Sequence, residues 1–231
     1  MIAPNTSSAT TRPNPTIWHV READGREDAF YLVRRWHHYF GVEYESNHLP
    51  YGPYQIAGWD DEDDPARPAL GVIATQERPD GTSVDIGGGL VELLDHDTMV
   101  EQLPEGRFER AALAGDLNAM LWFGLVDPAW RGLGIGRALF RKRLEWAQAQ
   151  GADMVVAWGW ERREGRTSRP LFDRYDFVPI QRFPDHYAES RDACPDCGVW
   201  PSDDATCECE AVLWARDLPI DDLAATVGLS R

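Results

Sequence analysis

The pattern of hydrophobic and polar residues along the chain predicts alternating strands and helices. The segment "TIWHVREA", residues 16–23, is typical of a first strand. Asp24 and Glu27, three residues later, form a capping-box sequence that predicts the start of a helix. Gly41 is placed to end that helix. One face of the helix carries three apolar residues, Phe30, Val33 and Phe40.

The middle of the chain predicts a hairpin, a buried strand and a second helix. Residues 69–76 and 83–93 are strand-like and flank Pro79-Asp80-Gly81, which is turn chemistry. The continuous apolar run "NAMLWFGLV", residues 118–126, predicts a strand buried on both faces, and it leads directly into a glycine-rich loop. The helix after the loop should end at Gly151. Its apolar face comprises Leu139, Phe140, Leu144 and Ala147.

The last third of the chain predicts three more strands and a short helix. Residues 152–160 are a buried strand, and residues 177–183 and 210–218 are two closing strands. Ser168 can cap a short helix with Pro170 in its first turn. By contrast, residues 1–15 are rich in Pro, Thr, Ser and Asn and should form a disordered arm.

Composition limits the classes of function. A chain of 231 residues with 43% hydrophobic content can bury one sizeable core. A formal net charge of −16 disfavours nucleic acids and membrane surfaces as partners. The first fifteen residues lack the apolar region of a signal peptide, so we expect a cytoplasmic protein. The acidic run 60–64 and the single lysine, Lys142, are typical of surfaces adapted to a salt-rich cytoplasm.

One segment departs from this acidic balance. Between Arg131 and Arg174 the chain has ten Arg or Lys residues against five Asp or Glu. The segment begins at the glycine run "RGLGIG", where Gly132, Gly134 and Gly136 let the backbone turn its amides toward an anion. The spacing is not that of a dinucleotide-binding turn, because Arg137 stands at the third glycine position, and it lacks the Lys and Ser/Thr of a P-loop. A pyrophosphate fits, and the alternative is a tight turn with solvated arginines.

The stretch "LVDPAWRGLGIGRAL", residues 125–139, resembles the acetyl-CoA-binding motif of the GNAT superfamily of N-acetyltransferases, V-x-P-x-x-R/Q-G-x-G-x-G/A. The resemblance implies an α/β fold with a mixed, mostly antiparallel central sheet flanked by helices, spanning residues 16–218. It also implies that Leu125 and Val126 contact the pantetheine arm of acetyl-CoA. The residues implied to hold the phosphates are Arg131, Gly132, Leu133, Gly134, Ile135, Gly136 and Arg137.

The second signature of the family is matched only in part by "GRTSRPLFDRYDF". Phe172 stands where the family often has a Tyr that protonates the departing thiolate, and a phenyl ring cannot donate a proton. Gly165 takes the position of an Asn, and Asp176 that of a Gly. Tyr175, three residues further on, is a candidate acid, and the alternative is that it only packs.

The base that deprotonates the amine is not placed by the motif. The position on the strand before the glycine loop where the family often has Glu falls near Met120. Asp116, Glu92 and Glu161, acting through water, are the candidates, against the alternative that they are ordinary surface acids. An enzyme that relies on positioning alone also fits the sequence.

All four cysteines fall in "CPDCGVWPSDDATCEC". Cys194 and Cys197 form C-x-x-C, and Cys207 and Cys209 form C-x-C nine residues later, a spacing typical of tetrathiolate zinc. Redox-active thiols and disulfides are the alternatives, and His186 could replace one ligand. Four thiolates leave no open position, so we expect a structural zinc ribbon at about residues 190–210.

Together these features predict an enzyme that moves an acetyl or short acyl group from acyl-CoA to an amine of a small molecule or protein. We expect direct attack in a ternary complex, because zinc would leave no cysteine as a nucleophile. The alternative is an acyl-CoA-binding regulatory module whose zinc ribbon docks a partner. The acceptor and the oligomeric state, a homodimer included, stay open, and residues 219–231 should form a short tail helix.

Overall fold

The computed structural model describes residues 17–40, 52–58, 67–161, 167–184, 209–221 and 223. These residues form a seven-stranded sheet in the order β1-β2-β3-β4-β5-β7-β6. The strands are β1 (Trp18–Glu22), β2 (Ala69–Glu77), β3 (Ser83–Asp95), β4 (Leu117–Val126), β5 (Met154–Glu161), β6 (Val178–Phe183) and β7 (Glu210–Asp217). Every neighbouring pair is antiparallel except β4 and β5, which are parallel. The prediction of a mixed, mostly antiparallel sheet is therefore confirmed.

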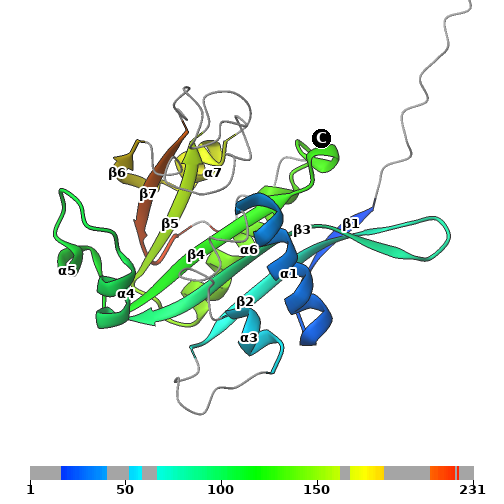
Figure 1. Cartoon of the computed structure of the whole chain (residues 1–231), viewed down its shortest axis with the longest axis horizontal. Coiled ribbons are helices and arrows are strands. Elements are labelled where there is room, and N and C mark those ends of the chain that lie inside the picture. The colour runs from blue at the N-terminus through cyan, green and yellow to red at the C-terminus, as the bar shows by residue number, and fades with distance from the viewer. Residues whose placement is uncertain are drawn as a thin grey trace, which may run out of the picture.

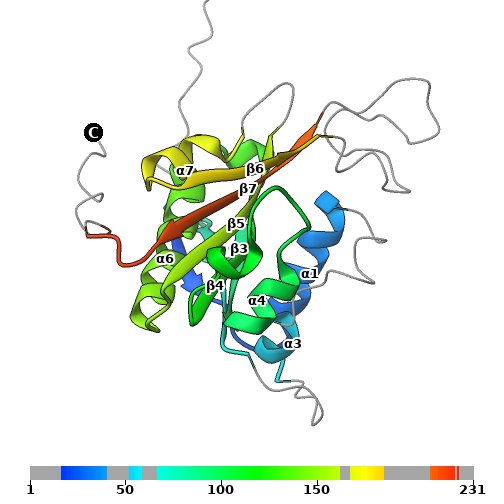
Figure 2. The ribbon, with the colours of Figure 1, turned by 90° about the vertical axis from the view of Figure 1, so that its left-hand side faces the viewer.

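Helices cover both faces of the sheet. They are α1 (Gly25–Phe40), α3 (Gly52–Ile56), α4 (His96–Gln102), α5 (Arg110–Leu113), the 3-10 turn η1 (Pro128–Trp130), α6 (Ile135–Ala149) and α7 (Arg169–Arg174). Figure 2 shows α6 and α7 on one face and α1, α3 and α4 on the other. Within the described residues, no helix has the length and apolar character needed to cross a bilayer.

The apolar face of α6 builds the larger core. As predicted, Leu139, Phe140, Leu144 and Ala147 are buried, and they pack with α7 and with the α6-facing side of the sheet. The helix ends before Gly151, whose φ of 81° is accessible to glycine at little cost. The helix α6, which follows the glycine loop, is thus anchored by its apolar face against one side of the sheet.

The predicted apolar face of α1 is partly wrong. Phe30 is 51% exposed, whereas Ala29, Leu32 and Trp36 are buried against the sheet. The buried residues recur at intervals of three and four, so they form one helical stripe, and Phe30 lies beside it. The side chain of Phe40, and Gly41, lie outside the described residues.

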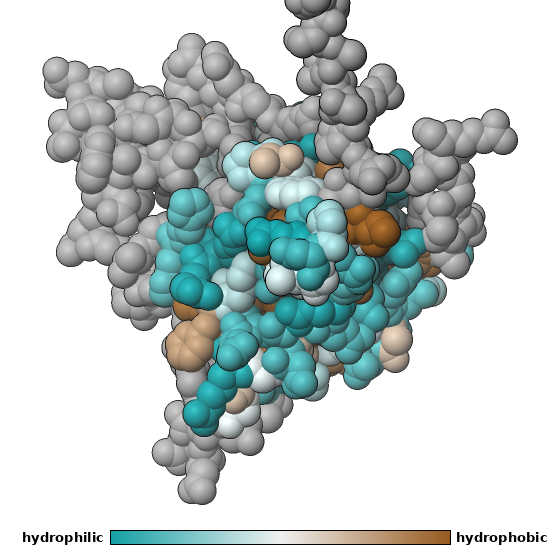
Figure 3. All heavy atoms as spheres, turned by 90° about the vertical axis from the view of Figure 1, so that its right-hand side faces the viewer, coloured by the Kyte–Doolittle hydropathy of each residue, from teal (hydrophilic) through white to brown (hydrophobic). Residues whose placement is uncertain are grey.

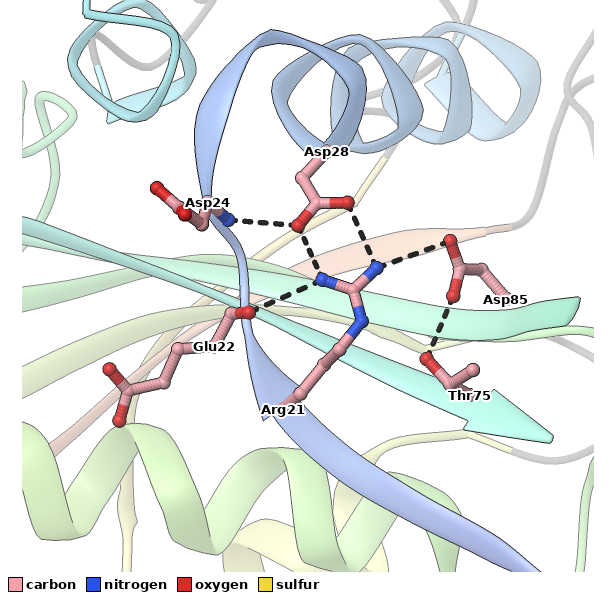
Figure 4. A network of polar contacts seen from close by, with 6 residues as sticks. All are labelled: Arg21, Glu22, Asp24, Asp28, Thr75 and Asp85. Atoms are coloured by element: carbon pink, nitrogen blue, oxygen red, sulfur yellow. Dashed lines mark hydrogen bonds and ion pairs between the residues drawn. The ribbon is translucent and has the colours of Figure 1, made fainter. Parts of the chain in front are cut away.

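The start of α1 is held by a polar network rather than by the predicted capping box. The backbone N–H of Asp24 donates to the carboxylate of Asp28, not of Glu27 (Figure 4). The same carboxylate pairs with both terminal nitrogens of Arg21, which lowers the pKa of Asp28 below its ordinary value. Asp28 serves better than Glu27 because it faces β1, where Arg21 also reaches Asp85 of β3.

Two short helices were not predicted, α4 and α5. The carboxylate of Asp95 accepts from the N–H of Thr98 and caps α4, so a capping signal was present in the sequence. Ser168 does precede α7, but its hydroxyl makes no capping hydrogen bond. Viewed from the end of the sheet where the β2–β3 hairpin projects, the described surface is mostly hydrophilic (Figure 3).

Candidate functional site

The two central strands separate over half their length. β4 and β5 pair only over residues 118–121 and 154–157, although the strands continue to Val126 and Glu161. Figure 1 shows the two strands side by side at one end and diverging toward the other. We call this opening the fork. The β5-facing edge of residues 122–126 has no strand partner among the described residues, so its amides are available to a ligand, whereas the carbonyl of Val126 accepts from Arg131.

A bulge and two tryptophans lie where the fork begins. In the pairing with β3, Leu90 lies opposite Phe123 and Val91 opposite Leu121, so Trp122 is an extra residue that bends β4. The first residue of each strand beyond the β4–β5 ladder is a tryptophan, Trp122 on β4 and Trp158 on β5, and both pack into the same cluster on the α4 face. The β4–β5 ladder therefore stops at the point where the bulge begins.

A buried arginine supports the bulge from the α6 face. Arg143 is 3% exposed, and its guanidinium donates to the carbonyls of Leu90, Phe123 and Leu139. A Cβ at Gly89 or Gly124 would overlap the guanidinium, so these glycines provide its space. Burial lowers the pKa of Arg143 to about 9, which still leaves it protonated at neutral pH. Arg143 therefore provides hydrogen-bond donors to backbone carbonyls at the point where the regular β3–β4 ladder is interrupted.

The glycine loop presents a row of free amides. Gly132 and Gly134 both have φ of 84°, a conformation that favours glycine. The first backbone hydrogen bond of α6 runs from the N–H of Ala138 to the carbonyl of Gly134. Among the described residues, no backbone carbonyl accepts from the amides of residues 132–137. These amides, with the positive N-terminal end of a 15-residue helix, form an anion site.

Arginines and an ion pair border the loop. Arg131 donates from Nε to the carbonyl of Val126, at 2.9 Å, which folds the loop back onto the end of β4. Within the described part of the chain, neither Arg131 nor Arg137 pairs with a carboxylate. Arg35 of α1 binds Asp127 at 2.6 Å, just before the loop, so α1 fixes the point where the loop begins. The charge around the loop is therefore suited to a phosphorylated ligand.

A buried carboxylate lies beside the fork, on the face opposite α6. Glu92 of β3 is 1% exposed, accepts from Nε1 of Trp122 at 2.7 Å and also accepts from the N–H of Gly52. Burial raises the pKa of Glu92 to about 7, although these two donors act in the opposite direction. Glu92 lies directly opposite Met120 in the β3–β4 pairing. The carboxylate of Glu92 is thus on the strand next to Met120, the position where the family often has a glutamate.

Of the other two candidate bases, Asp116 lies away from the fork and Glu161 is held in an ion pair. Asp116 is exposed and precedes the first residue of β4, roughly 30 Å along the strand from Val126. Glu161 ends β5, and its carboxylate pairs with Arg182 at 2.7 Å, which also pairs with Glu210. The structure therefore brings Glu92, but not Asp116, to the fork.

The aromatic residues of α7 are buried in the core beneath β5. Phe172 is 3% exposed and stacks on Trp214, with ring centroids 5.0 Å apart. Tyr175 is also 3% exposed and stacks on Phe140 at 5.3 Å, and its hydroxyl has no hydrogen-bond partner among the described residues. Asp176, at the position of a family glycine, has a positive φ of 54°.

Most of the cysteine window lies outside the described residues, as do Cys194, Cys197 and Cys207. Cys209 is fully buried and directly precedes β7. Within the described part of the chain, no group of three or more potential metal ligands is present. The predicted arm, residues 1–15, and most of residues 219–231 also lie outside it.

Comparison with known proteins identifies the family. The model of the acetyltransferase (GNAT) family matches residues 17–177. The structure of Arabidopsis thaliana NAA60 in complex with acetyl-CoA has a TM-score of 0.56 and 13% identity, over 87% of this chain and 99% of that one. The structure of the same protein with a bisubstrate analogue has a TM-score of 0.57 and 13% identity, over 88% of this chain and 99% of that one. The structure of mosquito arylalkylamine N-acetyltransferase like 5b has a TM-score of 0.52 and 11% identity, over 87% of this chain and 100% of that one.

No curated protein matches the chain. The family model nevertheless spans well over half of the sequence, including the fork and the glycine loop. The protein is therefore a member of the GNAT acetyltransferase family.

Proposed function

We propose that the protein transfers an acetyl or short acyl group from acyl-CoA to an amine. The observation that carries the proposal is the continuity between the unpaired edge of β4 and the free amides of residues 132–137. An extended amide-bearing arm that ends in a pyrophosphate has the shape and the polarity to fill both. The structure of NAA60 with acetyl-CoA supports the same choice of ligand.

Each part of acyl-CoA then has a partner. The pyrophosphate accepts from the amides of residues 132–137, and Arg131 and Arg137 balance its charge. The pantetheine arm pairs with the edge of β4 at Leu125 and Val126 in the manner of an added strand. This places the thioester at the fork, close to the bulge at Trp122. We propose Glu92 as the general base, in preference to Asp116 and Glu161.

The reaction is direct attack in a ternary complex. The neutral amine attacks the thioester carbonyl from the α1 and α4 face, a C–N bond forms, and the C–S bond breaks. The proton lost by the amine passes through water to Glu92, whose oxygens each keep one fixed donor, Gly52 and Trp122. A carboxylate with a pKa of about 7 is a stronger base than an ordinary glutamate and is ionised above neutral pH. For the leaving thiolate, Tyr175 is one candidate acid and solvent is the other.

The acceptor is an amine of a small molecule or of a protein. Amines are cations at neutral pH, and the net charge of −16 raises their concentration near the surface. Trp122 and Trp158 border the fork on the acceptor face and can contact an apolar or aromatic group next to the amine. Among the similar structures, mosquito arylalkylamine N-acetyltransferase like 5b is named for a small-molecule amine acceptor.

Two measurements test this function. Calorimetry should show saturable binding of acetyl-CoA to the intact protein, and a panel of arylalkylamines and peptide N-termini should release CoA as free thiol. Absence of acetyl-CoA binding would contradict the whole proposal. Tight acetyl-CoA binding with no thiol release from any acceptor would instead support an acyl-CoA-responsive regulatory module.

We also propose that Cys194, Cys197, Cys207 and Cys209 bind one structural zinc ion. The spacing supports a tetrathiolate site, and the full burial of Cys209 at the start of β7 fits a ligand that anchors the insertion to the sheet. Protein purified without oxygen should contain one zinc per chain by elemental analysis. A Cys209→Ser variant should lose it, and a stoichiometry well below one in the unmodified protein would rule the site out.

A further inference from the structure

A buried hydrogen-bond donor lies beneath the fork with nothing to bind. Trp214 of β7 is 2% exposed, and its Nε1 has no hydrogen-bond partner among the described residues. A buried donor left unpaired costs free energy and calls for an explanation, and a bound ligand is one such explanation. The hydroxyl of Tyr175 is in the same state, so the position of the Trp214 indole is what distinguishes it.

The position of this donor is set by a glycine. Trp214 pairs with Ala157, but its indole lies across β5 so that a Cβ on Gly159 would stand 2.7 Å from Nε1. Gly159 lies beyond the last β4–β5 pair, in the half of β5 that borders the fork. The absence of a side chain at Gly159 thus lets the indole N–H of a β7 residue reach β5 in the half that borders the fork.

Phe172 lies in the same place and cannot act as a donor. A Cβ on Gly159 would stand 2.9 Å from Cε2 of Phe172, and the phenyl ring stacks on the indole with an interplanar angle of 15°. The tip of each ring therefore reaches the same point of β5, and only the indole carries a hydrogen there that can be donated. Tyr175 is separated from this point, since it stacks on Phe140, which in turn contacts Phe172.

We propose that the indole N–H of Trp214 donates a hydrogen bond to the sulfur of acyl-CoA and stabilises the departing thiolate. The inference rests on the proposed function, because it needs acyl-CoA in the fork. When the amine nitrogen bonds to the carbonyl carbon, the C–S bond breaks and its electron pair stays on sulfur. Trp214 keeps its proton, the amine proton passes through water to Glu92, and the thiolate takes a proton from solvent. Trp214 acts electrostatically, as an oxyanion hole does.

Calorimetry on a ligand that lacks the sulfur tests the contact. The unmodified protein should bind CoA about five- to tenfold more tightly than desulfo-CoA, and Trp214→Phe should lose most of this preference. The kcat of Trp214→Phe should fall about 10- to 100-fold with the KM for the amine unchanged, because a hydrogen bond to a charged sulfur is stronger than one to a thiol. Trp146→Phe, the same change at a partly buried indole of α6, should keep both the preference and the kcat.

A spectroscopic measurement on the unmodified protein covers the case in which Trp214→Phe does not fold. In protein labelled with ¹⁵N-tryptophan, the indole N–H resonance assigned to Trp214 should move downfield with CoA and stay in place with desulfo-CoA. If neither ligand binds, the proposed function itself fails. If both bind equally and the resonance does not respond to sulfur, or if Tyr175→Phe rather than Trp214→Phe lowers kcat, only the role of Trp214 is overturned.

Discussion

Replacing Glu92 by glutamine lowers kcat by about 10²- to 10⁴-fold, the range that a general base contributes. Glutamine keeps the size of the side chain and can still accept from Nε1 of Trp122, but it cannot take a proton. In the unmodified protein, kcat/KM should rise with pH through about 7, where the Glu92 carboxylate ionises. The variant should lack this rise. The measurement is a pH–rate profile with thiol detection of released CoA.

Glu92→Gln should lower activity but raise the unfolding free energy, relative to the unmodified protein, as the pH increases. The pKa of Glu92 is about 7 in the folded chain and 4.5 in the unfolded chain, so the folded state binds more protons between these values. Stability from this group is fully present below pH 4.5 and is lost as the pH rises to 7. The unfolding free energy of Glu92→Gln relative to the unmodified protein should therefore rise by about 3 kcal/mol between about pH 4.5 and pH 8.

Asp116→Asn and Glu161→Gln are the comparison variants for both measurements. Asp116 is at the far end of β4 and Glu161 is paired with Arg182, so neither change should remove the pH-dependent rise. Loss of the rise in Glu161→Gln, with its retention in Glu92→Gln, would assign the base to the end of β5.

Replacing Gly134 by valine weakens acetyl-CoA binding roughly 10- to 100-fold, equivalent to the loss of one hydrogen bond to a charged group. Gly134 has a φ of 84°, which a β-branched residue adopts only with strain. When the backbone relaxes, the amides around it turn away from the pyrophosphate. A side chain here meets only Arg137, at 4.0 Å, so the effect comes from the backbone and the ligand space and not from core packing. Isothermal calorimetry gives the change in affinity.

Gly151→Val is the matched control for Gly134→Val. Gly151 lies at the other end of α6 and has nearly the same φ, 81°, and a Cβ added there would meet no atom within 4 Å. Both variants should lose ~1–3 kcal/mol of unfolding free energy through strain. Only the Gly134 variant should lose affinity, and equal losses would mean that the loop amides do not bind the phosphates.

The central part of the fold was predictable because its signals are local. The apolar run of β4, the glycine loop and the apolar face of α6 each follow from short-range periodicity, and all three were placed correctly. The face of α1 was harder because Phe30 is as apolar as its neighbours. Its exposure depends on the helix rotation that is set by Arg21 and Asp28, a contact across seven residues.

The proton-transfer side of the site depends on pairing between strands, which a single sequence does not contain. Glu92 was one of three candidate bases, and only the β3–β4 register places it opposite Met120 and against Trp122. One signal was available, since Glu92 is an acid inside the apolar run "GGGLVELL". The fork tryptophans were missed because the alignment of β4 with β5, a parallel pair joined through α6, sets which residues meet.

The fork also has a kinetic consequence. The pairing of β4 with β5 already ends at Leu121 and Ala157 in the chain without any ligand. The free-energy cost of leaving two strand edges unpaired is therefore part of folding and does not recur at each turnover. Acyl-CoA meets an opening that already exists, so little of its interaction energy goes into reorganising the protein. In a catalytic cycle, the cofactor can enter and leave without waiting for the sheet to open.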